Sequence, residues 1–530
     1  MIEYDGMKYL PRQWVHATIG ELVSTDGIFN DGDWVESKDQ DPKGDIRLIQ
    51  LADVGDGLYR NRSARFLTSQ KAQELNCTFL ATGDVLIARM PDPLGRACVF
   101  PGDSKGAVTV VDVCIVRLGS ERVNNKWLMF AVNSPQFRAE IAKLQSGSTR
   151  KRISRGNLAT LVLPVPPSKE QRRMADKIEE LFTKLDAGIE ELTKVQKQIK
   201  RFRQVVLRDA VTGQLTKAWR EENKADLERA DYFLKRILTE RREQWEKEQF
   251  QKFKESGNIP LNDFWKKKYK EPKAPDTENL PELPEDWTWI NLDTVLTKIE
   301  AGKSFRCNER PPQIGEVGIV KVSAVTWGTF NELESKTPLN GNLVNERFLI
   351  TAGDFLFSRA NTIDLVGTCV IVRSFSRQLM LSDKILRFRF IILSSEFLLN
   401  LLRSEMGRSE IKRLATGNQD SMRNIGQDRI REIRIPLPPL SEQKEIVNEV
   451  ERLLSVADAI EETVRQSLKQ ATRLRQSILK LAFDGRLVPQ DPSDEPAEIL
   501  LERIKEEKEA RQKELKGKGR KSRPRRAKAS

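Results

Sequence analysis

This 530-residue chain has only one histidine and five cysteines. The number of cysteines is odd and no Cys-x-x-Cys pair occurs, which argues against a disulfide framework and against structural zinc. The single histidine, His16, argues against a Ser–His–Asp site and against a histidine-rich metal site. No run of 18 apolar residues and no basic-then-apolar start occur. We therefore expect no membrane span, no signal peptide and a cytoplasmic location.

Catalytic motifs are missing as well. The sequence has no Gly-x-x-x-x-Gly-Lys-Ser/Thr loop, because Thr297 stands where the first glycine before Gly302-Lys303-Ser304 would be needed. No Gly-x-Gly-x-x-Gly fingerprint follows a strand, and the Asn-Pro-Pro-aromatic motif of amino-methyltransferases is absent. We therefore expect a non-catalytic chain with no metal site and no cofactor of its own, whose task is binding.

The net charge of +13 is unevenly distributed. Eight of these charges lie in the last sixteen residues, 515–530, which contain no acidic residue. The remainder is close to neutral, so the basic isoelectric point is weak evidence for nucleic-acid binding. We expect the 515–530 tail to be disordered, and either to bind polyanions without regard to sequence or to be a solvated end.

What the chain does contain is an internal repeat with an offset of about 272 residues. Leu163-Pro164-Val165-Pro166-Pro167, followed by Glu170-Gln171, reappears as Ile435-Pro436-Leu437-Pro438-Pro439, followed by Glu442-Gln443. The register then holds without a gap through Asp186/Asp458, Glu190/Glu462, Arg203/Arg475, Gln204/Gln476, Leu207/Leu479, Ala210/Ala482, Gly213/Gly485 and Leu215/Leu487. A repeat of this length indicates two similar modules in one chain, so that a monomer imitates a dimer.

The repeat covers nearly the whole sequence. Each copy opens with Leu-Pro-x-x-Trp, at Leu10 and at Leu283, and continues with a β-like run, 48–54 or 319–325. A Gly-Asp turn then precedes an alternating apolar run in each copy, which predicts a strand after Gly83-Asp84 and after Gly353-Asp354. We expect one globular α/β domain in residues 10–160 and another in residues 283–432.

Between these landmarks the copies diverge. Asp31–Asp45 and Arg306–Gly315 have almost nothing in common, and neither have Met90–Leu94 and Asn361–Val366. His16 aligns with a tryptophan in the second copy, which argues against a catalytic or metal role for it. We interpret the matched residues as scaffold and the divergent loops as two readers with different targets.

A helical pattern follows each proline motif. Apolar residues recur every three or four positions after Pro167 and again after Pro439, which is typical of a coiled-coil seam. The pattern predicts helical regions at 164–257 and 436–507, with a proline-rich linker at 258–282. The matched lengths favour an antiparallel helix pair over an ordinary intramolecular bundle. The expected fold is α+β, with two globular α/β domains separated by long antiparallel coiled-coil helices and a pseudo-twofold internal repeat.

The ends of the two long helices carry their own signals. Ser168 with Gln171 predicts a capping box, and Ser441 would cap the second helix one residue later in the motif. Gly213 and Gly485 are the expected residues just beyond the carboxyl ends.

Candidate binding residues lie just before each proline motif. Arginine and lysine fork to guanine or neutralise phosphate, while glutamine and asparagine pair with adenine, and a nearby glycine lets the backbone approach. The candidates are Ser148, Thr149, Arg150, Lys151 and Arg152 in the first copy, Asn418, Gln419, Ser421 and Arg423 in the second, and Arg89, Arg359 and Asn361 at the ends of the matched strands. Their equivalent places in both copies favour DNA contact over the alternative, a polar surface loop.

This order of elements, given twice between residues 10 and 507, resembles the specificity subunit of type I restriction–modification systems. The resemblance implies two target-recognition domains, each reading one half of an asymmetric, bipartite double-stranded DNA sequence, with the helices as a ruler between them. It also implies two modification (methyltransferase) subunits and restriction (motor-nuclease) subunits as partners. S-adenosylmethionine, ATP and Mg²⁺ would bind to those partners, which methylate adenine and cleave DNA, and none to this chain.

Two other functions stay open at this point. A coiled-coil scaffold with two protein-binding domains would need no polar-basic strip beside each helix. A fused methyltransferase–nuclease would need the catalytic motifs that are missing. The charged extension Arg241–Lys270 departs from the repeat, and we expect it to be an elongated helix or a subunit contact.

Overall fold

The computed structural model describes residues 10–91, 93–148, 150–326, 329–340 and 344–521. The chain divides into two units: unit 1 comprises residues 1–193 and 465–530, and unit 2 comprises residues 194–464. Each unit therefore holds the globular domain of one copy together with helical segments of both copies. Unit 2 holds the helical end of the first copy and the start of the long helix of the second copy, and unit 1 holds the start of the long helix of the first copy and the helical end of the second.

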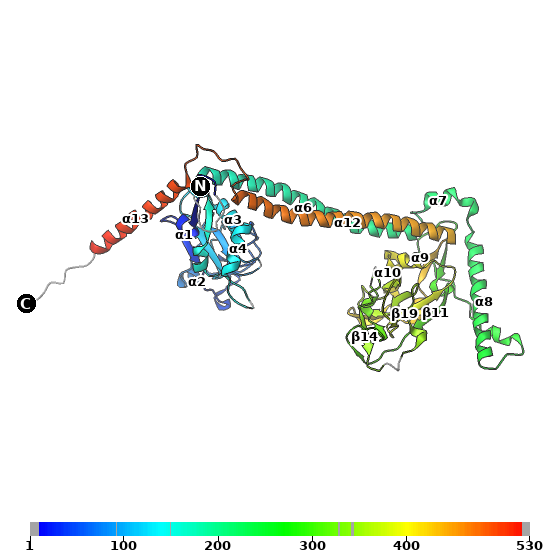
Figure 1. Cartoon of the computed structure of the whole chain (residues 1–530). Helices are drawn as coiled ribbons and strands as arrows, with labels where there is room; N and C mark the ends of the chain where they lie inside the picture. Colours follow the sequence, from blue (N-terminus) through cyan, green and yellow to red (C-terminus); the bar gives the residue numbers. More distant parts are fainter. Residues whose placement is uncertain (1–9, 92, 149, 327–328, 341–343, 522–530) are drawn as a thin grey trace, which may run out of the picture. The chain divides into compact units, whose positions relative to one another are not determined.

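Unit 1 contains a globular domain, the first part of one long helix and the last part of another (Figure 1). Its elements are β1 (Val15–Thr18), α1 (Ile19–Leu22), β2 (Ile28–Asp31), η1 (Ser37–Asp39), β3 (Ile46–Ile49), β4 (Phe66–Leu67), α2 (Ser69–Glu74), β5 (Val85–Ala88), β6 (Ala97–Val99), β7 (Ala107–Thr109), β8 (Val113–Arg117), α3 (Asn125–Asn133), α4 (Pro135–Leu144), α5 (Arg155–Thr160), β9 (Val162–Val165), the start of α6 (Ser168–Val211), the end of α12 (Leu440–Phe483) and α13 (Ala497–Lys521).

Unit 2 repeats this plan with additions. Its elements are the end of α6, α7 (Lys217–Glu222), η2 (Lys224–Asp226), α8 (Ala230–Glu255), η3 (Asp263–Lys268), β10 (Thr288–Asn291), η4 (Leu292–Thr294), β11 (Leu296–Ala301), β12 (Cys307–Asn308), β13 (Gly318–Val320), η5 (Val322–Ala324), β14 (Ser335–Pro338), η7 (Glu346–Phe348), β15 (Phe355–Ser358), β16 (Ala360–Asn361), β17 (Cys369–Ile371), β18 (Leu379–Met380), β19 (Ile385–Phe390), α9 (Ser395–Arg403), α10 (Glu405–Leu414), β20 (Thr416–Gln419), β21 (Met422–Asn424), α11 (Gln427–Arg431), β22 (Arg434–Leu437) and the start of α12.

The sheets of the two globular domains correspond strand by strand. The order β2-β8-β5-β6 in unit 1 matches β11-β19-β15-β17 in unit 2, and the β1–β9 pair matches β10–β22. The strand predicted after each Gly-Asp turn is present as β5 and as β15. The β-like runs 48–54 and 319–325 are strands only in part, because their second halves form a turn and the helix η5.

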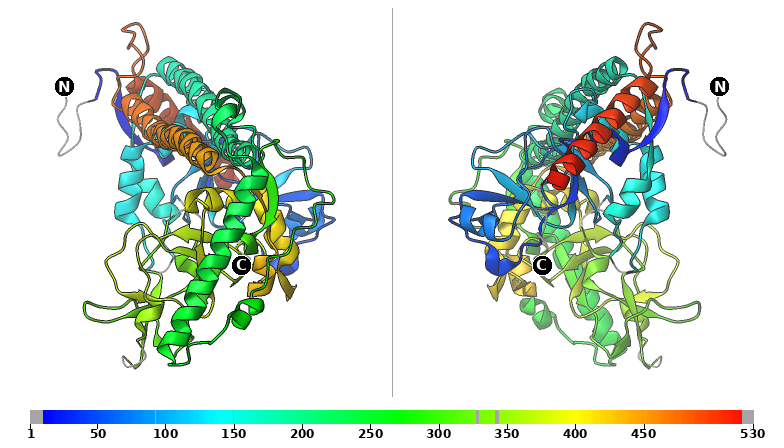
Figure 2. Two further views of the ribbon diagram at one scale, coloured as in Figure 1. Left: turned by 90° about the vertical axis from the view of Figure 1, so that its right-hand side faces the viewer. Right: turned by 90° about the vertical axis from the view of Figure 1, so that its left-hand side faces the viewer.

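Helices α6 and α12 are each 44 residues long and run antiparallel within each unit. In unit 1 the start of α6, at Ile178, shares a hydrophobic core with the end of α12, at Ile478, and α6 and α12 lie side by side (Figure 2). In unit 2 the end of α6, at Val206, shares a core with the start of α12, at Val450. The antiparallel coiled coil that the heptads predicted is confirmed, since Val450, Ala457, Val464, Ala471 and Ile478 recur every seventh residue and are all buried.

The proline motif fastens each long helix to its globular domain. In unit 1 the indole of Trp14 donates to Glu170 at 3.0 Å, and in unit 2 the indole of Trp287 donates to Glu442 at 2.7 Å. Next to each glutamate, Gln171 donates to the carbonyl of Pro166 at 2.9 Å and accepts from the backbone N–H of Asn124, the N-cap of α3. Gln443 makes the same two bonds with Pro438 and with Ser394, the N-cap of α9.

These contacts correct the predicted helix caps. The glutamine of the motif does not close a capping box but joins three segments of its unit. Ser168 is already helical and its hydroxyl donates to the carbonyl of Arg122, and α12 begins at Leu440, before the predicted cap Ser441. The motif is matched between the copies because it supports tertiary contacts, which a local helix signature does not reveal.

The glycine after each long helix meets the opening motif of the other copy. Gly485 has φ +70°, and a Cβ there would lie 2.4 Å from Cγ of Pro11. Gly213 has φ +73°, and a Cβ there would lie 2.5 Å from Cγ of Pro284. Both positions require the left-handed backbone and the close approach that glycine allows.

Two segments left open by the sequence have definite backbones. The extension Arg241–Lys270 continues α8 and then turns back through η3. Trp245 is stacked on Trp265 at 5.9 Å between ring centroids and is tilted against Tyr269 at 5.3 Å. Helix α13 runs to Lys521, so residues 515–521 of the basic tail continue a helix where disorder was expected from composition. Residues 522–530 lie outside the described part.

Candidate nucleic-acid interface

An exposed hairpin in unit 2 carries most of the second-copy candidates. Strands β20 and β21 pair around a turn at Asp420-Ser421, and β16 pairs with the other side of β21. This small sheet brings together Asn361, Asn418, Gln419, Ser421 and Arg423. We call residues 416–424 the C-terminal hairpin.

The turn of the C-terminal hairpin is held from two sides. The guanidinium of Arg423 donates to Asp420 at 2.7 Å, and the carbonyl of Asp420 accepts from the backbone N–H of Ile363 at 2.8 Å. The charge of Arg423 is therefore partnered within the hairpin. Its tip presents amides, a hydroxyl and a thioether.

The two strands present different faces. Gln419 and Met422 are direct cross-strand partners, so their side chains lie on one face. Arg423 is opposite Asn361 on the other face and is half-buried. Met422, with 74% of its surface exposed, and the exposed Asn424 stand on the same small sheet as the candidates, although the sequence analysis did not include them. In a strand that starts after the Asp420-Ser421 turn, side chains alternate between the two faces, so Met422 and Asn424 could have been predicted to lie on the same face.

Unit 1 has an equivalent loop with different chemistry. Ser146 and Arg152 form an isolated bridge with two backbone hydrogen bonds of 2.8 Å, and Gly147 has φ +96° where Gly417 has φ +130°. We call residues 146–152 the N-terminal hairpin. Ser148, Arg150, Lys151 and Arg152 are exposed, and no described carboxylate pairs with the three cations. Thr149 lies outside the described residues.

Arg89 and Arg359 occupy the same place beneath the two hairpins. The carbonyl of Arg89 accepts from Ile153 at 3.1 Å, and the carbonyl of Arg359 accepts from Ile425 at 2.9 Å. Their side chains serve their own domain: Arg89 is paired with Asp31, and Arg359 donates to Asn424 at 3.3 Å. Both arginines therefore support a hairpin base, and the exposed side chains around them make the surface.

The divergent loops start beside these arginines. Asp31, the first residue of the 31–45 segment, contacts both Arg89 and Arg155. In unit 2 the 306–315 segment contains the extra strand β12, which pairs with β14 and has no counterpart among the described strands of unit 1.

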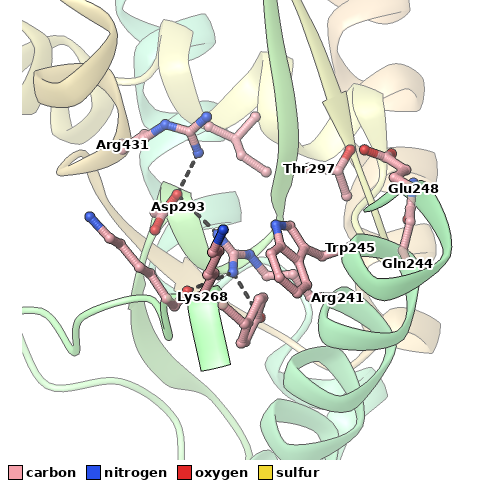
Figure 3. A pocket seen from close by; sticks show the side chains of 11 residues that line it. Arg241, Gln244, Trp245, Glu248, Lys268, Asp293, Thr297 and Arg431 are labelled. Carbon is pink, nitrogen blue, oxygen red and sulfur yellow. Dashed lines mark hydrogen bonds and ion pairs between the residues drawn. The ribbon is translucent and has the colours of Figure 1, made fainter. Parts of the chain in front are cut away.

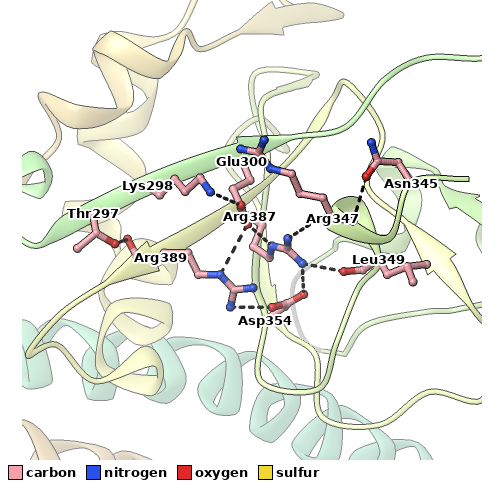
Figure 4. Close-up of polar contacts among 9 residues, drawn as sticks. All are labelled: Thr297, Lys298, Glu300, Asn345, Arg347, Leu349, Asp354, Arg387 and Arg389. Atoms are coloured by element: carbon pink, nitrogen blue, oxygen red, sulfur yellow. Dashed lines mark hydrogen bonds and ion pairs between the residues drawn. The ribbon is translucent and has the colours of Figure 1, made fainter. Parts of the chain in front are cut away.

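A charge cluster in the globular domain of unit 2 joins β11, β19 and the start of β15 (Figure 4). Arg387 donates to Glu300 at 2.7 Å and to Asp354 at 3.0 Å, and Arg389 reaches the other oxygen of Asp354 at 3.0 Å. Burial opposes the ionisation of Glu300, but hydrogen bonds from Lys298 and Arg387 outweigh it and its pKa lies below the ordinary value. These pairs are satisfied internally, so we assign them to the scaffold.

Unit 1 has a simpler version of this cluster. Arg117 donates to Asp84 at 2.8 and 2.7 Å, as Arg389 pairs with Asp354 in unit 2. Strand register places Ile115 where Arg387 stands. The Gly-Asp motif thus marks a shared carboxylate that pairs with an arginine of the neighbouring strand.

The extension in unit 2 closes a cleft of about 390 Å³ against the globular domain (Figure 3). Asp293 accepts from Arg431 at 2.5 Å and from Arg241 at 3.4 Å, and Arg241 also donates to the hydroxyl of Tyr269 at 2.8 Å. Because these charges partner one another, we interpret the contacts that line the cleft as structural: they attach α8 to the globular domain.

The repeat-equivalent joint in unit 1 uses another chemistry. Lys508 donates to the carbonyls of Gly20 at 2.9 Å and Glu21 at 3.3 Å, at the end of α1. Burial lowers the pKa of Lys508, although the charge of Glu21 opposes this. Equivalent residues, Arg241 on α8 and Lys508 on α13, thus attach these helices to the globular domains of their units.

Metal-ligating clusters and two of the cysteines were further candidates for chemistry. No group of three or more histidine, cysteine or carboxylate side chains is placed to hold a metal ion among them. Burial raises the pKa of the Cys98 thiol to about 12 and that of Cys77 to about 11, so neither is an activated nucleophile. None of the helices in this part of the chain combines the length and apolar character needed to cross a bilayer.

The sequence matches the family model for the type I restriction modification DNA specificity domain twice, over residues 11–200 and 284–470. The chain belongs to the type I restriction–modification specificity subunits. Members of this family are the non-catalytic components of their systems. The two matches coincide with the two copies of the repeat, so the specificity subunit carries its family domain twice.

Individual relatives agree with the family. The type I restriction enzyme EcoEI specificity subunit of Escherichia coli is 26% identical over 456 residues, which cover 77% of this chain and 73% of that protein. A chain solved for the complex assembly and conformational transition of a type I R–M system has a TM-score of 0.60 at 17% identity, covering 91% of this specificity subunit and all of that chain. The HsdS subunit from Thermoanaerobacter tengcongensis has a TM-score of 0.51 at 18% identity, covering 91% and 99%. Both structures share the fold.

Proposed function

We propose that the chain reads an asymmetric, bipartite double-stranded DNA target, one half with each globular domain. The observation that carries the proposal is the pair of equivalent hairpins on matched frames. One presents Arg150, Lys151 and Arg152, and the other presents Asn418 and Gln419 beside a partnered Arg423. Matched frames with different exposed side chains suit two readers of different DNA sequences.

The long helices set the separation of the two half-sites in this proposal and bind the partner subunits. Phe202 on α6 is 40% exposed, and its repeat equivalent Leu474 on α12 is 48% exposed. Equivalent apolar side chains on the two units suit two copies of one partner, which we assign as modification subunits that methylate adenine with S-adenosylmethionine. Restriction subunits join the complex and use ATP and Mg²⁺ to move and cleave DNA. None of these cofactors is assigned to this chain.

A domain exchange tests the proposal. Residues 10–160 are replaced by the corresponding domain of a related specificity subunit, and methylated sites are mapped genome-wide in cells that also express the modification partner. We expect one half of the recognition sequence to change and the other half to persist. The matched control exchanges residues 283–432 and should change the opposite half. A change in both halves, or in neither, would contradict the modular reading. Unchanged methylation after alanine substitution of Arg150, Lys151, Arg152 and Gln419 together would favour a scaffold with protein-binding domains.

A further inference from the structure

The face of the C-terminal hairpin shared by Gln419 and Met422 has a more specific use, which rests on the proposed function. The two residues are cross-strand partners next to the Asp420-Ser421 turn, so an amide and a thioether stand side by side. Met422 is 74% exposed and belongs to none of the hydrophobic clusters of the described residues. A large apolar side chain in this place gains nothing from the fold.

The chemistry of the pair matches one kind of base pair. On the major-groove edge, adenine offers N7 as acceptor and N6 as donor, which a glutamine amide binds through two hydrogen bonds. Thymine offers its 5-methyl group, the one apolar feature of that edge, which apolar side chains contact. A two-stranded ribbon is narrow enough to enter the major groove. We infer that Gln419 and Met422 together read an A·T base pair, with Met422 against the thymine methyl group.

The charges of the hairpin support base contact over phosphate contact. Arg423 is paired with Asp420 at 2.7 Å, so the tip adds no free positive charge. The N-terminal hairpin differs, because Arg150 and Lys151 are exposed and face no described carboxylate. A tip of amides and a thioether has little attraction for phosphate but suits base edges.

The hairpin is also preorganised. Its turn is tied to Ile363 through a 2.8 Å backbone hydrogen bond, and β16 extends the ladder on the far side of β21. Asn424, on the same strand face as Met422, accepts from Arg359 at 3.3 Å. The backbone that carries the pair is thus held in place before DNA arrives, which is what selective readout requires.

The test uses the full chain with its modification partner and the target found by methylation mapping. Each thymine in the half-site of the C-terminal domain is replaced in turn by deoxyuridine, which lacks the methyl group, and each adenine by 7-deazaadenine, which lacks N7. We expect one deoxyuridine and one 7-deazaadenine, in the same base pair, to weaken binding about tenfold each. Met422→Ala should remove the sensitivity to deoxyuridine only, and Gln419→Ala the sensitivity to 7-deazaadenine only.

Two further variants separate this inference from simpler explanations. Met422→Leu keeps an apolar side chain and should keep the sensitivity to deoxyuridine, whereas Lys151→Ala should weaken all DNA similarly and leave both sensitivities intact. Sequence-specific binding that ignores every deoxyuridine, or Met422→Ala protein that remains sensitive to it, would overturn the inference and leave the proposed function standing. Absence of any sequence-specific binding by the wild-type complex would overturn both.

Discussion

Asp186 of α6 and Arg475 of α12 form an ion pair in unit 1, and their repeat equivalents form the reverse pair in unit 2. There Asp458 of α12 accepts from Arg203 of α6 at 2.5 Å. In each pair the aspartate of one copy meets the arginine of the other. A twofold axis between two identical helices would produce the same pair of contacts. Here the two helices belong to one chain.

Charge reversal tests this relation. Asp186→Arg places two like charges together and should lower stability by about 1 kcal/mol or less, because both side chains are partly exposed. Arg475→Asp should lower it by a similar amount, and the double variant Asp186→Arg with Arg475→Asp should recover most of the loss. Thermal denaturation of the four proteins checks this. A double variant that is less stable than either single one would contradict the pairing.

The two motif glutamates should respond differently to substitution. Glu442 is fully buried and accepts from Thr216, Trp287 and Arg220, whereas Glu170 accepts only from Trp14 and has one oxygen without a hydrogen-bond partner. Glu442→Gln should cost about 2–3 kcal/mol, because it removes the negative charge facing a nearly buried arginine.

Glu170→Gln is the matched control for that change. Burial raises the pKa of Glu170, although Trp14 and Arg173 oppose this, so the charged form is disfavoured where it stands. We expect a change within about 1 kcal/mol, because the amide keeps an acceptor for Trp14. Chemical denaturation of both variants gives the comparison, and an equal loss in the two would show that the motif works identically in both units.

Two glycines of the long helices make another matched pair: Gly485 follows the end of α12, and Gly188 lies inside α6. Gly485→Ala should destabilise by about 1–3 kcal/mol, because its Cβ would overlap Pro11 and its φ is +70°. Gly188→Ala should stabilise by up to about 1 kcal/mol, because Gly188 is inside α6 with open space around it. Thermal melting points of the two variants check the opposite signs. A Gly485→Ala protein as stable as wild type would show that the joint tolerates rearrangement.

Acid should weaken unit 2 through Glu410. Burial opposes its ionisation, but hydrogen bonds from Arg434 and Arg413 outweigh burial and lower its pKa to about 2, from an ordinary value of 4.5. Between these values the unfolded chain binds more protons, so the stabilisation present above pH 4.5 is lost as the pH falls toward about 2. Glu410→Gln should flatten this part of the stability profile, and Arg434→Gln should move the loss to higher pH. The free energy of unfolding of the three proteins, measured between about pH 2 and pH 7, tests this. Identical pH profiles for wild type and Glu410→Gln would contradict it.

The two hairpins should differ in their dependence on salt. Alanine at Arg150, Lys151 and Arg152 should weaken binding to all DNA and reduce the slope of log affinity against log salt by about 2–3, if each cation neutralises one phosphate. Alanine at Asn418 and Gln419 should weaken binding to the target and leave the slope unchanged. Binding measured between 50 and 200 mM salt, roughly the range over which such effects are large, separates the two. Equal slopes in both variants would argue against the division of labour.

Much of the frame was predictable because its signals are local or periodic. The heptad spacing from Val450 to Ile478 gave the long helix, and the Gly-Asp turn before Val85 and Phe355 gave a strand in each copy. The offset of the repeat gave the equivalence of the two domains before any contact was known.

The candidate site was less predictable because pairing across distant residues decides which charges are free. Asp31 lies 58 residues before Arg89 and partners it, which no local pattern reveals. Arg423 is partnered by a residue only three positions away, yet the hairpin that brings them together depends on β16. Met422 was missed because the search favoured polar side chains, while its exposure is visible only once the strand register is known.

The contact of Gly485 with Pro11 also bears on connectivity. Gln13, in the opening motif of the first copy, donates to the carbonyl of Asp494 at 2.9 Å and accepts from Ala497 at 3.0 Å, so the first and last matched segments are spatial neighbours. The joint at Gly213 and Pro284 is the same junction with the chain running on through the 258–282 linker. The end of the second copy therefore meets the opening motif of the first copy within unit 1, at a junction equivalent to the continuous one in unit 2. A permuted chain that begins near residue 275 and joins residue 514 to residue 10 through a flexible connector should retain every contact described within the two units.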